Sequence, residues 1–180
     1  GPNQYLNTID LYTIGRIEVA KGTGSVQYGT DAMGGVVQIF TKEPEFSLSG
    51  NKLTGRLTGK YMTGGMEKTG RGEIAFANKK VALLAGISKK DFGDLIGGDT
   101  TGKQSPSGYD EWGLDLNLKF SLQKNTTLQF VSQLLQQQHV PVYHKVRLEN
   151  FQLNEMDPQR RLFSYARLRK VNGSRIFKET

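Results

Sequence analysis

The sequence predicts an all-β protein whose strands follow one another as an antiparallel up-and-down meander. Glycine supplies 22 of the 180 residues, well above its average usage of about 7%, and glycine is costly inside helices. Apolar and polar residues alternate with the period of two that is typical of strands. The connections between these alternating runs are short and long in turn, so neighbouring strands are expected to be joined directly.

The alternation is clearest near the middle of the chain. Every second residue from Trp112 to Leu122 is apolar, and the residues between them are polar or small. The runs are about ten residues long, close to the ~9–11 residues that a tilted strand needs to cross a bilayer. Comparable runs are predicted at residues 53–62, 70–78, 81–89, 127–136 and 161–171, and a seventh begins at Ser174.

The connections differ in length according to the end of the strands that they join. Tight turns are predicted at residues 78–80, 123–125 and 172–174, and long polar connections at 91–109 and 137–158, with an intermediate link at 63–69. Short turns at one rim and long loops at the other are typical of outer-membrane barrels, whose short turns face the periplasm. A soluble meander shows the same alternation, so the strands alone leave both interpretations open. Three aromatic residues near strand ends, Tyr61, Tyr109 and Trp112, fit an interfacial girdle.

The first 44 residues differ in sequence pattern from the rest of the chain. Residues 16–21 and 36–41 are predicted to be short strands, and a glycine-rich loop at 22–35 joins them. The segments 4–10, 16–22 and 28–39, followed by Thr41 and Lys42, closely resemble the C-terminal half of the plug domain of TonB-dependent outer-membrane receptors. Residues 140–146 and 157–161 are similar to a loop-to-strand passage in the barrels of some members of this family.

The resemblance implies two parts. Residues 1–44 are expected to form the C-terminal part of a plug domain, and residues 45–180 the N-terminal strands of a partial, antiparallel transmembrane β-barrel. Transporters of this type have about 22 strands, so the chain is expected to be a fragment of a longer receptor. The energy-coupling box, the first half of the plug and most barrel strands would lie outside it.

The resemblance also implies a function. Such a receptor lies among the lipids of the outer membrane of a diderm bacterium and imports a scarce nutrient. A TonB-type energy-coupling protein in the periplasm supplies the energy. The leading cargo is a small metal chelate, a ferric siderophore or haem, with cobalamin and glycans as other candidates. The alternative is a soluble or secreted all-β binding or adhesion module without transport activity.

The sequence does not predict a catalytic activity. The sequence shows no nucleophile with a partner base, no acid/base dyad and no cluster of metal ligands, and it contains no cysteine. An enzyme and a cofactor-binding protein are therefore not predicted. The net charge of +7 does not indicate nucleic acid either, because the basic residues are spread along alternating strands instead of forming one basic patch with aromatic residues.

Charged residues on the polar side of the predicted strands have two interpretations. They could attract an anionic cargo through long-range electrostatics, or they could pair with carboxylates of the plug and hold it in place. The plug-side candidates for such pairs are Arg16 and Glu18. The strand residues concerned are Arg56, Lys60, Lys119, Arg167 and Arg169, together with Arg71 and the acidic Glu73 and Asp115.

Two further groups are candidates for ligand contact. Thr23, Ser25 and Gln27 lie in the glycine-rich loop, and some plug loops of the family touch substrate. The chain's two histidines, His139 and His144, fall in a predicted long loop. A neutral imidazole can ligate haem iron, although two loop histidines are equally explained as solvated side chains.

The alternation generates a prediction for the chain expressed alone in water. We expect it to self-associate, because the apolar side of residues 114–122 and the unpaired strand edges would be exposed to water. Size-exclusion chromatography with light scattering measures this. A monodisperse monomer that unfolds cooperatively would contradict the membrane interpretation.

Overall fold

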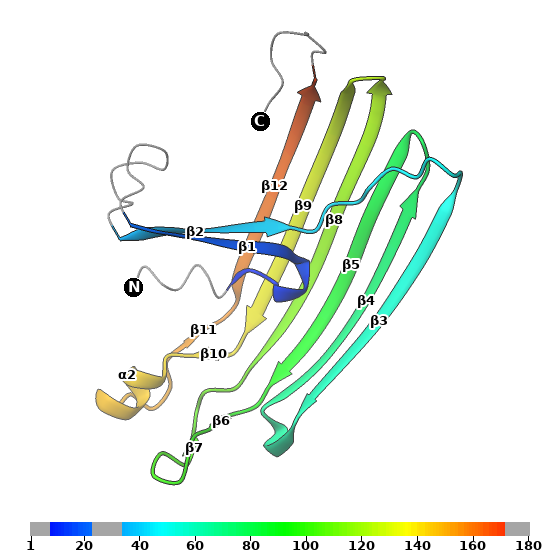
Figure 1. Cartoon of the computed structure of the whole chain (residues 1–180). Helices are drawn as coiled ribbons and strands as arrows, with labels where there is room; N and C mark the ends of the chain where they lie inside the picture. The colour runs from blue at the N-terminus through cyan, green and yellow to red at the C-terminus, as the bar shows by residue number, and fades with distance from the viewer. Residues whose placement is uncertain (1–7, 23–33, 172–180) are drawn as a thin grey trace. The chain divides into compact units, whose positions relative to one another are not determined.

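The computed structural model describes residues 8–22 and 34–171. The chain divides into two compact units, Gly1–Glu43 and Pro44–Thr180. Nearly all of the secondary structure is antiparallel sheet (Figure 1), so the predicted all-β fold is confirmed. One short α-helix, α2 (Tyr143–Leu148), occurs within the described ranges. In that part of the chain no helix has both the length and the apolar character needed to cross a membrane.

The first unit is built around a two-stranded hairpin. The short 3₁₀ helix η2 (Leu11–Thr13) precedes it, and Asp10 caps this helix by accepting a hydrogen bond from the Tyr12 amide at 3.0 Å. Strands β1 (Ile14–Lys21) and β2 (Gly35–Thr41) then pair antiparallel. The two short strands predicted in this region are therefore confirmed.

Gly35 begins β2 at a place where no side chain fits. Its φ is +148°, and a Cβ added there would lie 2.7 Å from the Ala20 carbonyl oxygen of the opposite strand. Because L residues rarely adopt this backbone conformation, both the geometry and the spacing of the hairpin require glycine here.

The second unit contains a six-stranded sheet. Its strands are neighbours in space in the same order as in the chain, and every pair is antiparallel. Strands β3 and β12 lie at the two edges, and among the described residues they are not paired with each other. The six predicted strands are confirmed, and the seventh, from Ser174, lies outside the described residues. The strands are β3 (Lys52–Met62), β4 (Glu67–Ala77), β5 (Val81–Phe92), β8 (Tyr109–Gln123), β9 (Thr126–Gln138) and β12 (Gln159–Lys170).

Short turns join the strands at one end of this sheet. One spans residues 78–80, where the Asn78 side-chain oxygen accepts hydrogen bonds from the amides of Lys80 at 2.9 Å and Val81 at 2.8 Å. The other turn is Lys124 and Asn125. Side-chain acceptance of turn amides is the usual reason that asparagine is favoured in such positions.

Three connections join the strands at the opposite end (Figure 1): the first is only four residues, 63–66, whereas the second and the third are long. The first contains the 3₁₀ turn η3 (Thr63–Gly65). The second, residues 93–108, contains β6 (Leu95–Ile96) and β7 (Lys103–Gln104), and the third, residues 139–158, contains β10 (Val140–Pro141), α2 and β11 (Glu155–Met156). The predicted difference between the two ends is thus confirmed.

The three connections at this end of the sheet contact one another. A Cβ at Gly93 would overlap the Gly65 carbonyl oxygen, and one at Gly64 would lie 2.7 Å from the Ile96 side chain. The Arg147 Nε of the third connection donates to the Ser105 carbonyl of the second at 3.0 Å. They therefore form one packed group at this end of the sheet.

The strand register separates the side chains into an apolar face and a polar face. Directly paired residues share a face, and one row across all six strands contains Leu57, Gly72, Ile87, Leu114, Leu134 and Leu162. A row on the other face contains Lys60, Thr69, Lys90, Glu111, Gln137 and Gln159.

Burial on the two faces is the reverse of that in a soluble sheet. Leu57 and Leu162, on the apolar face, are 91% and 66% exposed. The buried side chains of the described sheet all belong to the polar face, including its few buried apolar residues, Ala82, Val131 and Leu135. Soluble antiparallel sheets instead cover their apolar face.

The predicted aromatic girdle is correct only in part. Tyr61 and Trp112 lie on the apolar face near the long connections. Tyr109 lies on the polar face, where its ring stacks on Phe92 with 4.6 Å between the centroids. Tyr109 lies on the polar face because of the strand register at the start of β8, which the sequence pattern did not define.

The geometry at Gly35 generates a prediction. Replacing Gly35 by Ala should loosen the β1–β2 hairpin, because the methyl group would meet the Ala20 carbonyl and the positive φ would be strained by about 1 kcal/mol or more. Amide hydrogen exchange of residues 17–20 measures the effect. Gly34→Ala is the matched control, since a Cβ there meets nothing within 4 Å; equal exchange in the two variants would contradict the argument.

Candidate functional site

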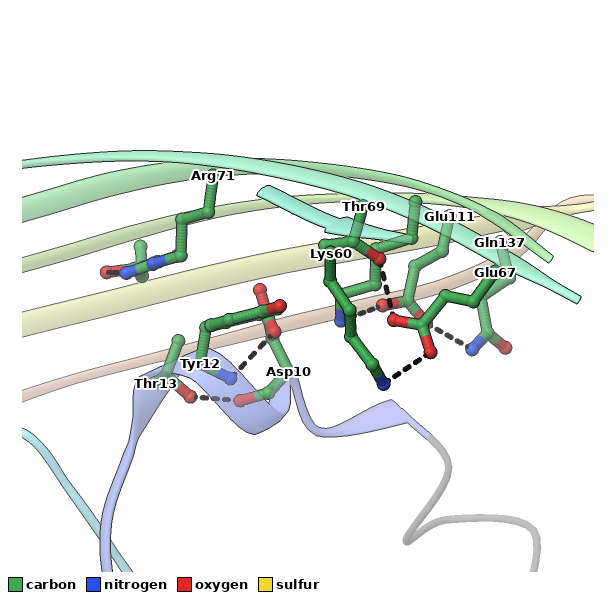
Figure 2. Close-up of polar contacts among 11 residues, drawn as sticks. Asp10, Tyr12, Thr13, Lys60, Glu67, Thr69, Arg71, Glu111 and Gln137 are labelled. Atoms are coloured by element: carbon green, nitrogen blue, oxygen red, sulfur yellow. Dashed lines mark hydrogen bonds and ion pairs between the residues drawn. The ribbon is translucent and has the colours of Figure 1, made fainter. Parts of the chain in front are cut away.

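Many charged residues of the six-stranded sheet lie on its polar face in an ordered arrangement. Long side chains project from it on β4, β5, β8 and β9, and they meet across the strands (Figure 2). Buried polar groups need partners, because leaving one unsatisfied costs about 1–3 kcal/mol. The partners lie on the same strand or on other strands of the sheet, and those that include charged residues form two groups.

The first group, the Arg71 cluster, consists of Arg71, Glu73 and Asp115. Arg71 Nη1 and Nη2 donate to the two carboxylate oxygens of Asp115 at 2.7 and 3.1 Å, and Nη2 also donates to Glu73 Oε2 at 3.0 Å. The Arg71 side chain is only 2% exposed. A bidentate guanidinium–carboxylate pair of this kind is both strong and geometrically specific.

Gly86 makes the Arg71 cluster possible. Arg71 lies on β4 and Asp115 on β8, so the guanidinium must cross β5 between them. A Cβ at residue 86 would overlap this guanidinium. Glycine at this position therefore provides the space in which the charge pair crosses a strand.

The second group, the rim network, lies on the same face close to the long connections (Figure 2). Lys90 Nζ donates to Glu111 Oε1 at 2.6 Å, and Gln137 Nε2 donates to Glu111 Oε2 at 2.7 Å. Lys90 and Glu111 are 6% and 5% exposed. Lys60 and Thr69 both donate to the carboxylate of Glu67, at 2.6 and 2.7 Å.

Five members of the rim network were missed by the sequence analysis: Glu67, Thr69, Lys90, Glu111 and Gln137. The expected strands ended before these positions, whereas β4, β5, β8 and β9 continue through them. Continuing the period of two would have found them, because Lys90 follows Ser88 and Glu111 precedes Gly113 on the same face.

The strand residues predicted as charged site residues all lie on the polar face. Arg56 is directly opposite Glu73, and Lys60 pairs with Glu67 in the rim network. Lys119 is in a row with Gln129 and Arg167 across β8, β9 and β12. The guanidinium of Arg167 lies over the Tyr165 ring, 5.5 Å from its centroid, and Arg169 lies two positions further along β12.

The plug-side residues lie in the first unit. Arg16 and Glu18 form an ion pair with each other on β1 at 2.8 Å, and the Arg16 guanidinium also lies over the Phe40 ring at 4.4 Å. Both side chains are at least half exposed, so this pair contributes little stability. Thr23, Ser25 and Gln27 lie outside the described residues.

The two histidines lie in the third long connection. His139 is 64% exposed, and its ring nitrogens face two carboxylates, with Nδ1 4.0 Å from Asp110 Oδ2 and Nε2 3.8 Å from Asp157 Oδ2. His144 lies in α2, and its side chain is not among the described groups. Within the described ranges no three or more His, Cys, Asp or Glu residues are grouped so as to hold a metal ion.

The second long connection is closed by Asp94. Its Oδ1 accepts hydrogen bonds from the backbone amides of Ser107 at 2.8 Å and Gly108 at 3.1 Å. The Ser107 amide above all, and then Ser105, Gly108 and Lys103, lower the pKa of Asp94 from its usual value to about 2 against the opposing effect of burial. The carboxylate therefore stays ionised and ties the two ends of this connection together at neutral pH.

Comparison with known families gives one match. Residues 1–36 match the family model described as the TonB-dependent Receptor Plug Domain. No curated protein and no solved structure matches the chain. The matched family consists of receptors that work with TonB in the outer membrane of Gram-negative bacteria and is not a family of enzymes. The match supports the resemblance seen in the sequence over this part of the chain.

The Arg71 cluster generates a prediction. Asp115→Asn should destabilise the sheet by about 1–3 kcal/mol, because a buried guanidinium loses its bidentate partner and retains Glu73. Chemical denaturation in detergent, followed by tryptophan fluorescence, measures the loss. Lys89→Gln is the control, since it removes the exposed Lys89–Asp110 pair and should cost less than about 1 kcal/mol. Equal losses would show that burial of the Arg71 cluster is unimportant.

Proposed function

We propose that this chain is part of a TonB-dependent outer-membrane receptor that imports an iron chelate. One combination of observations carries the proposal: the segment that matches the plug family precedes a six-stranded meander whose apolar face is exposed. In this family the plug domain comes before the barrel strands. The described meander would supply the first of those strands.

The size of the apolar face supports a lipid environment. On β8 it extends from Trp112 to Leu122, which is about 33 Å along a strand at about 3.3 Å per residue. At the tilt of about 40° usual in outer-membrane barrels, this length covers about 25 Å of membrane, the height of their apolar band. Charged residues bound the face at both ends: Lys68, Lys89, Asp91 and Asp110 near the long connections, and Lys79, Lys80 and Lys124 at the short turns.

The alternative, a soluble or secreted binding module, requires a cover for the apolar face. In a soluble sandwich a second sheet packs on it. The other sheets in the described residues are each two-stranded, which is too small to cover six strands. This observation favours the membrane receptor.

The distribution of charge on the polar face supports an anionic cargo. Toward the short turns, the polar face carries Lys119 on β8 and, on the other side of β9, Arg167 and Arg169 on β12. A lumen lined in this way attracts anions. Closer to the long connections, the Arg71 cluster and the rim network contain their own counter-charges.

The surroundings of His139 favour a ferric siderophore over haem as the cargo. Both ring nitrogens of His139 face carboxylates, so coordination of iron would require that side chain to leave its present partners. In this proposal Thr23, Ser25 and Gln27 of the plug loop contact the cargo. A periplasmic TonB-type protein supplies the energy by pulling on the plug.

A charge placed on the apolar face tests the membrane assignment. In the full-length protein expressed in its host, Leu116→Arg should reduce the folded outer-membrane fraction, because an arginine facing lipid near mid-membrane costs about 2–4 kcal/mol. Gln133→Arg is the matched control, since it adds the same charge at similar depth on the polar face. Fractionation and heat-modifiable electrophoretic mobility measure the result. Equal fractions for both variants would refute a lipid-facing apolar face.

The cargo is tested separately in a deletion strain. Growth should fail on one ferric siderophore as the sole iron source and return with the wild-type gene. Loss of growth on haem alone, or on no iron source, would overturn the siderophore assignment while leaving the membrane assignment standing.

A further inference from the structure

A row of basic and aromatic side chains follows β12 on the polar face of the sheet. Odd-numbered residues of this strand share that face, because Phe163 is directly opposite Gln133, which is opposite Asp115 of the Arg71 cluster. From the end beside the long connections toward the end beside the short turns, the row extends about 26 Å at about 3.3 Å per residue. The row, here called the β12 stripe, consists of Arg161, Phe163, Tyr165, Arg167 and Arg169.

Neighbouring side chains of the β12 stripe stack on one another. The Arg161 guanidinium lies 5.2 Å from the centroid of the Phe163 ring, and the Arg167 guanidinium lies 5.5 Å from the centroid of the Tyr165 ring. The two rings are 5.6 Å apart, with 58° between their planes. Such distances are usual for cation–π and aromatic pairs. The stripe is therefore a continuous stack in which an arginine stands at each end of an aromatic pair.

The β12 stripe combines exposed rings with positive charge. Phe163 is 42% exposed and Tyr165 is half-buried, although the rest of this face is mainly polar. Strands β9 and β12 contain neither aspartate nor glutamate. Lys119 adds a further positive charge on the far side of Gln129 from Arg167. A negatively charged group is therefore attracted to this part of the face.

The neighbouring strand β9 supplies apolar surface beside the rings. Val131 is directly opposite Tyr165, Leu135 is directly opposite Arg161, and both apolar side chains are buried. A molecule held on the stripe would contact apolar surface, ring faces and guanidinium groups together. An occupant with aromatic rings and negatively charged oxygens matches all three.

We propose that the β12 stripe binds a siderophore of the catecholate class, whose iron-binding groups are aromatic rings with negatively charged oxygens. Its rings stack on Phe163 and Tyr165, and its oxygens face the guanidinium groups of Arg161 and Arg167. The inference rests on the proposed function, and it narrows the cargo from ferric siderophores in general to one chemical class.

Two other cargo chemistries match the stripe less well. The iron-binding groups of a hydroxamate siderophore contain no aromatic ring, so Phe163 and Tyr165 would have no stacking partner. Haem carries its carboxylates on one edge of the porphyrin, whereas the stripe has arginines at both ends of the aromatic pair.

Iron uptake by the full-length protein tests the proposal. The protein is expressed in a host strain that lacks its own siderophore receptors. Ferric enterobactin and the ferric complex of dihydroxybenzoylserine are the catecholate probes, and ferrichrome, an uncharged trihydroxamate, is the comparison. Uptake of radioactive iron is expected with a catecholate and not with ferrichrome.

Variants of the stripe test the residues. Phe163→Leu, Tyr165→Leu and Arg167→Gln should each raise the concentration for half-maximal catecholate uptake about fivefold to tenfold, since each loses a stacking or cation–π contact. Arg160→Gln is the matched control, because it removes a charge from the apolar face of the same strand and should leave this concentration unchanged. Uptake is compared per amount of folded protein, measured by heat-modifiable mobility.

Two results would overturn the catecholate site. One is uptake of ferrichrome or of haem without uptake of either catecholate. The other is half-maximal uptake that is unchanged in the three stripe variants, or a loss of uptake that their smaller folded fractions fully explain, which would give the stripe a structural role such as holding the plug.

Failure of the catecholate site is distinguishable from failure of the proposed function. Uptake of ferrichrome alone leaves an iron-chelate receptor and refutes only the catecholate site. Wild-type protein that takes up no iron chelate, or that does not fractionate with the outer membrane, refutes the receptor assignment itself.

Discussion

A buried charge on a β-sheet needs a counter-charge within reach in order to remain ionised. In this protein Arg71 on β4 reaches across β5 to Asp115 on β8, through the space that Gly86 leaves. The contact joins three strands in one register. A slip of one residue would move Arg71 to the apolar face and separate it from Asp115, which lies two strands away. The pair therefore specifies how the strands align, beyond any contribution to stability.

The same requirement organises the end of the sheet beside the long connections. The carboxylates of Glu67 and Glu111 each accept two hydrogen bonds from side chains of the polar face. The contact of Lys60 with Glu67 joins β3 to β4, and the contacts of Glu111 with Lys90 and Gln137 join β5, β8 and β9, just where the regular strands end. The long connections then start from fixed positions, and contacts such as that of Gly64 with Ile96 pack them against one another. A receptor that recognises cargo through such connections benefits from ends that are held in this way.

The apolar face lies on the side of the sheet opposite these polar contacts. Polar groups take up the buried side of the sheet, so leucine, isoleucine and phenylalanine are left exposed on the other. In water such a surface would associate with other surfaces, whereas in a membrane it is the surface in contact with lipid. The match of residues 1–36 to the plug family agrees with the second environment. Gly59 and Gly70, which are paired on this face, carry no side chain where the charged residues begin.

The sequence by itself determined the all-β fold, the six strands and the unequal connections, because a period of two and glycine-rich or asparagine-containing turns are local properties. It also placed Lys60, Lys119 and Arg167 on one face, since alternation alone assigns faces. It could not determine the ends of the strands, so Lys90, Glu111 and Gln137 were missed and Tyr109 was assigned to the wrong face. Only the tertiary structure decided which face is buried, which carboxylate meets Arg71 and where the paired glycines leave space. Each of these depends on register between strands far apart in the chain, and register is set by the pairing of whole strands and not by any local pattern.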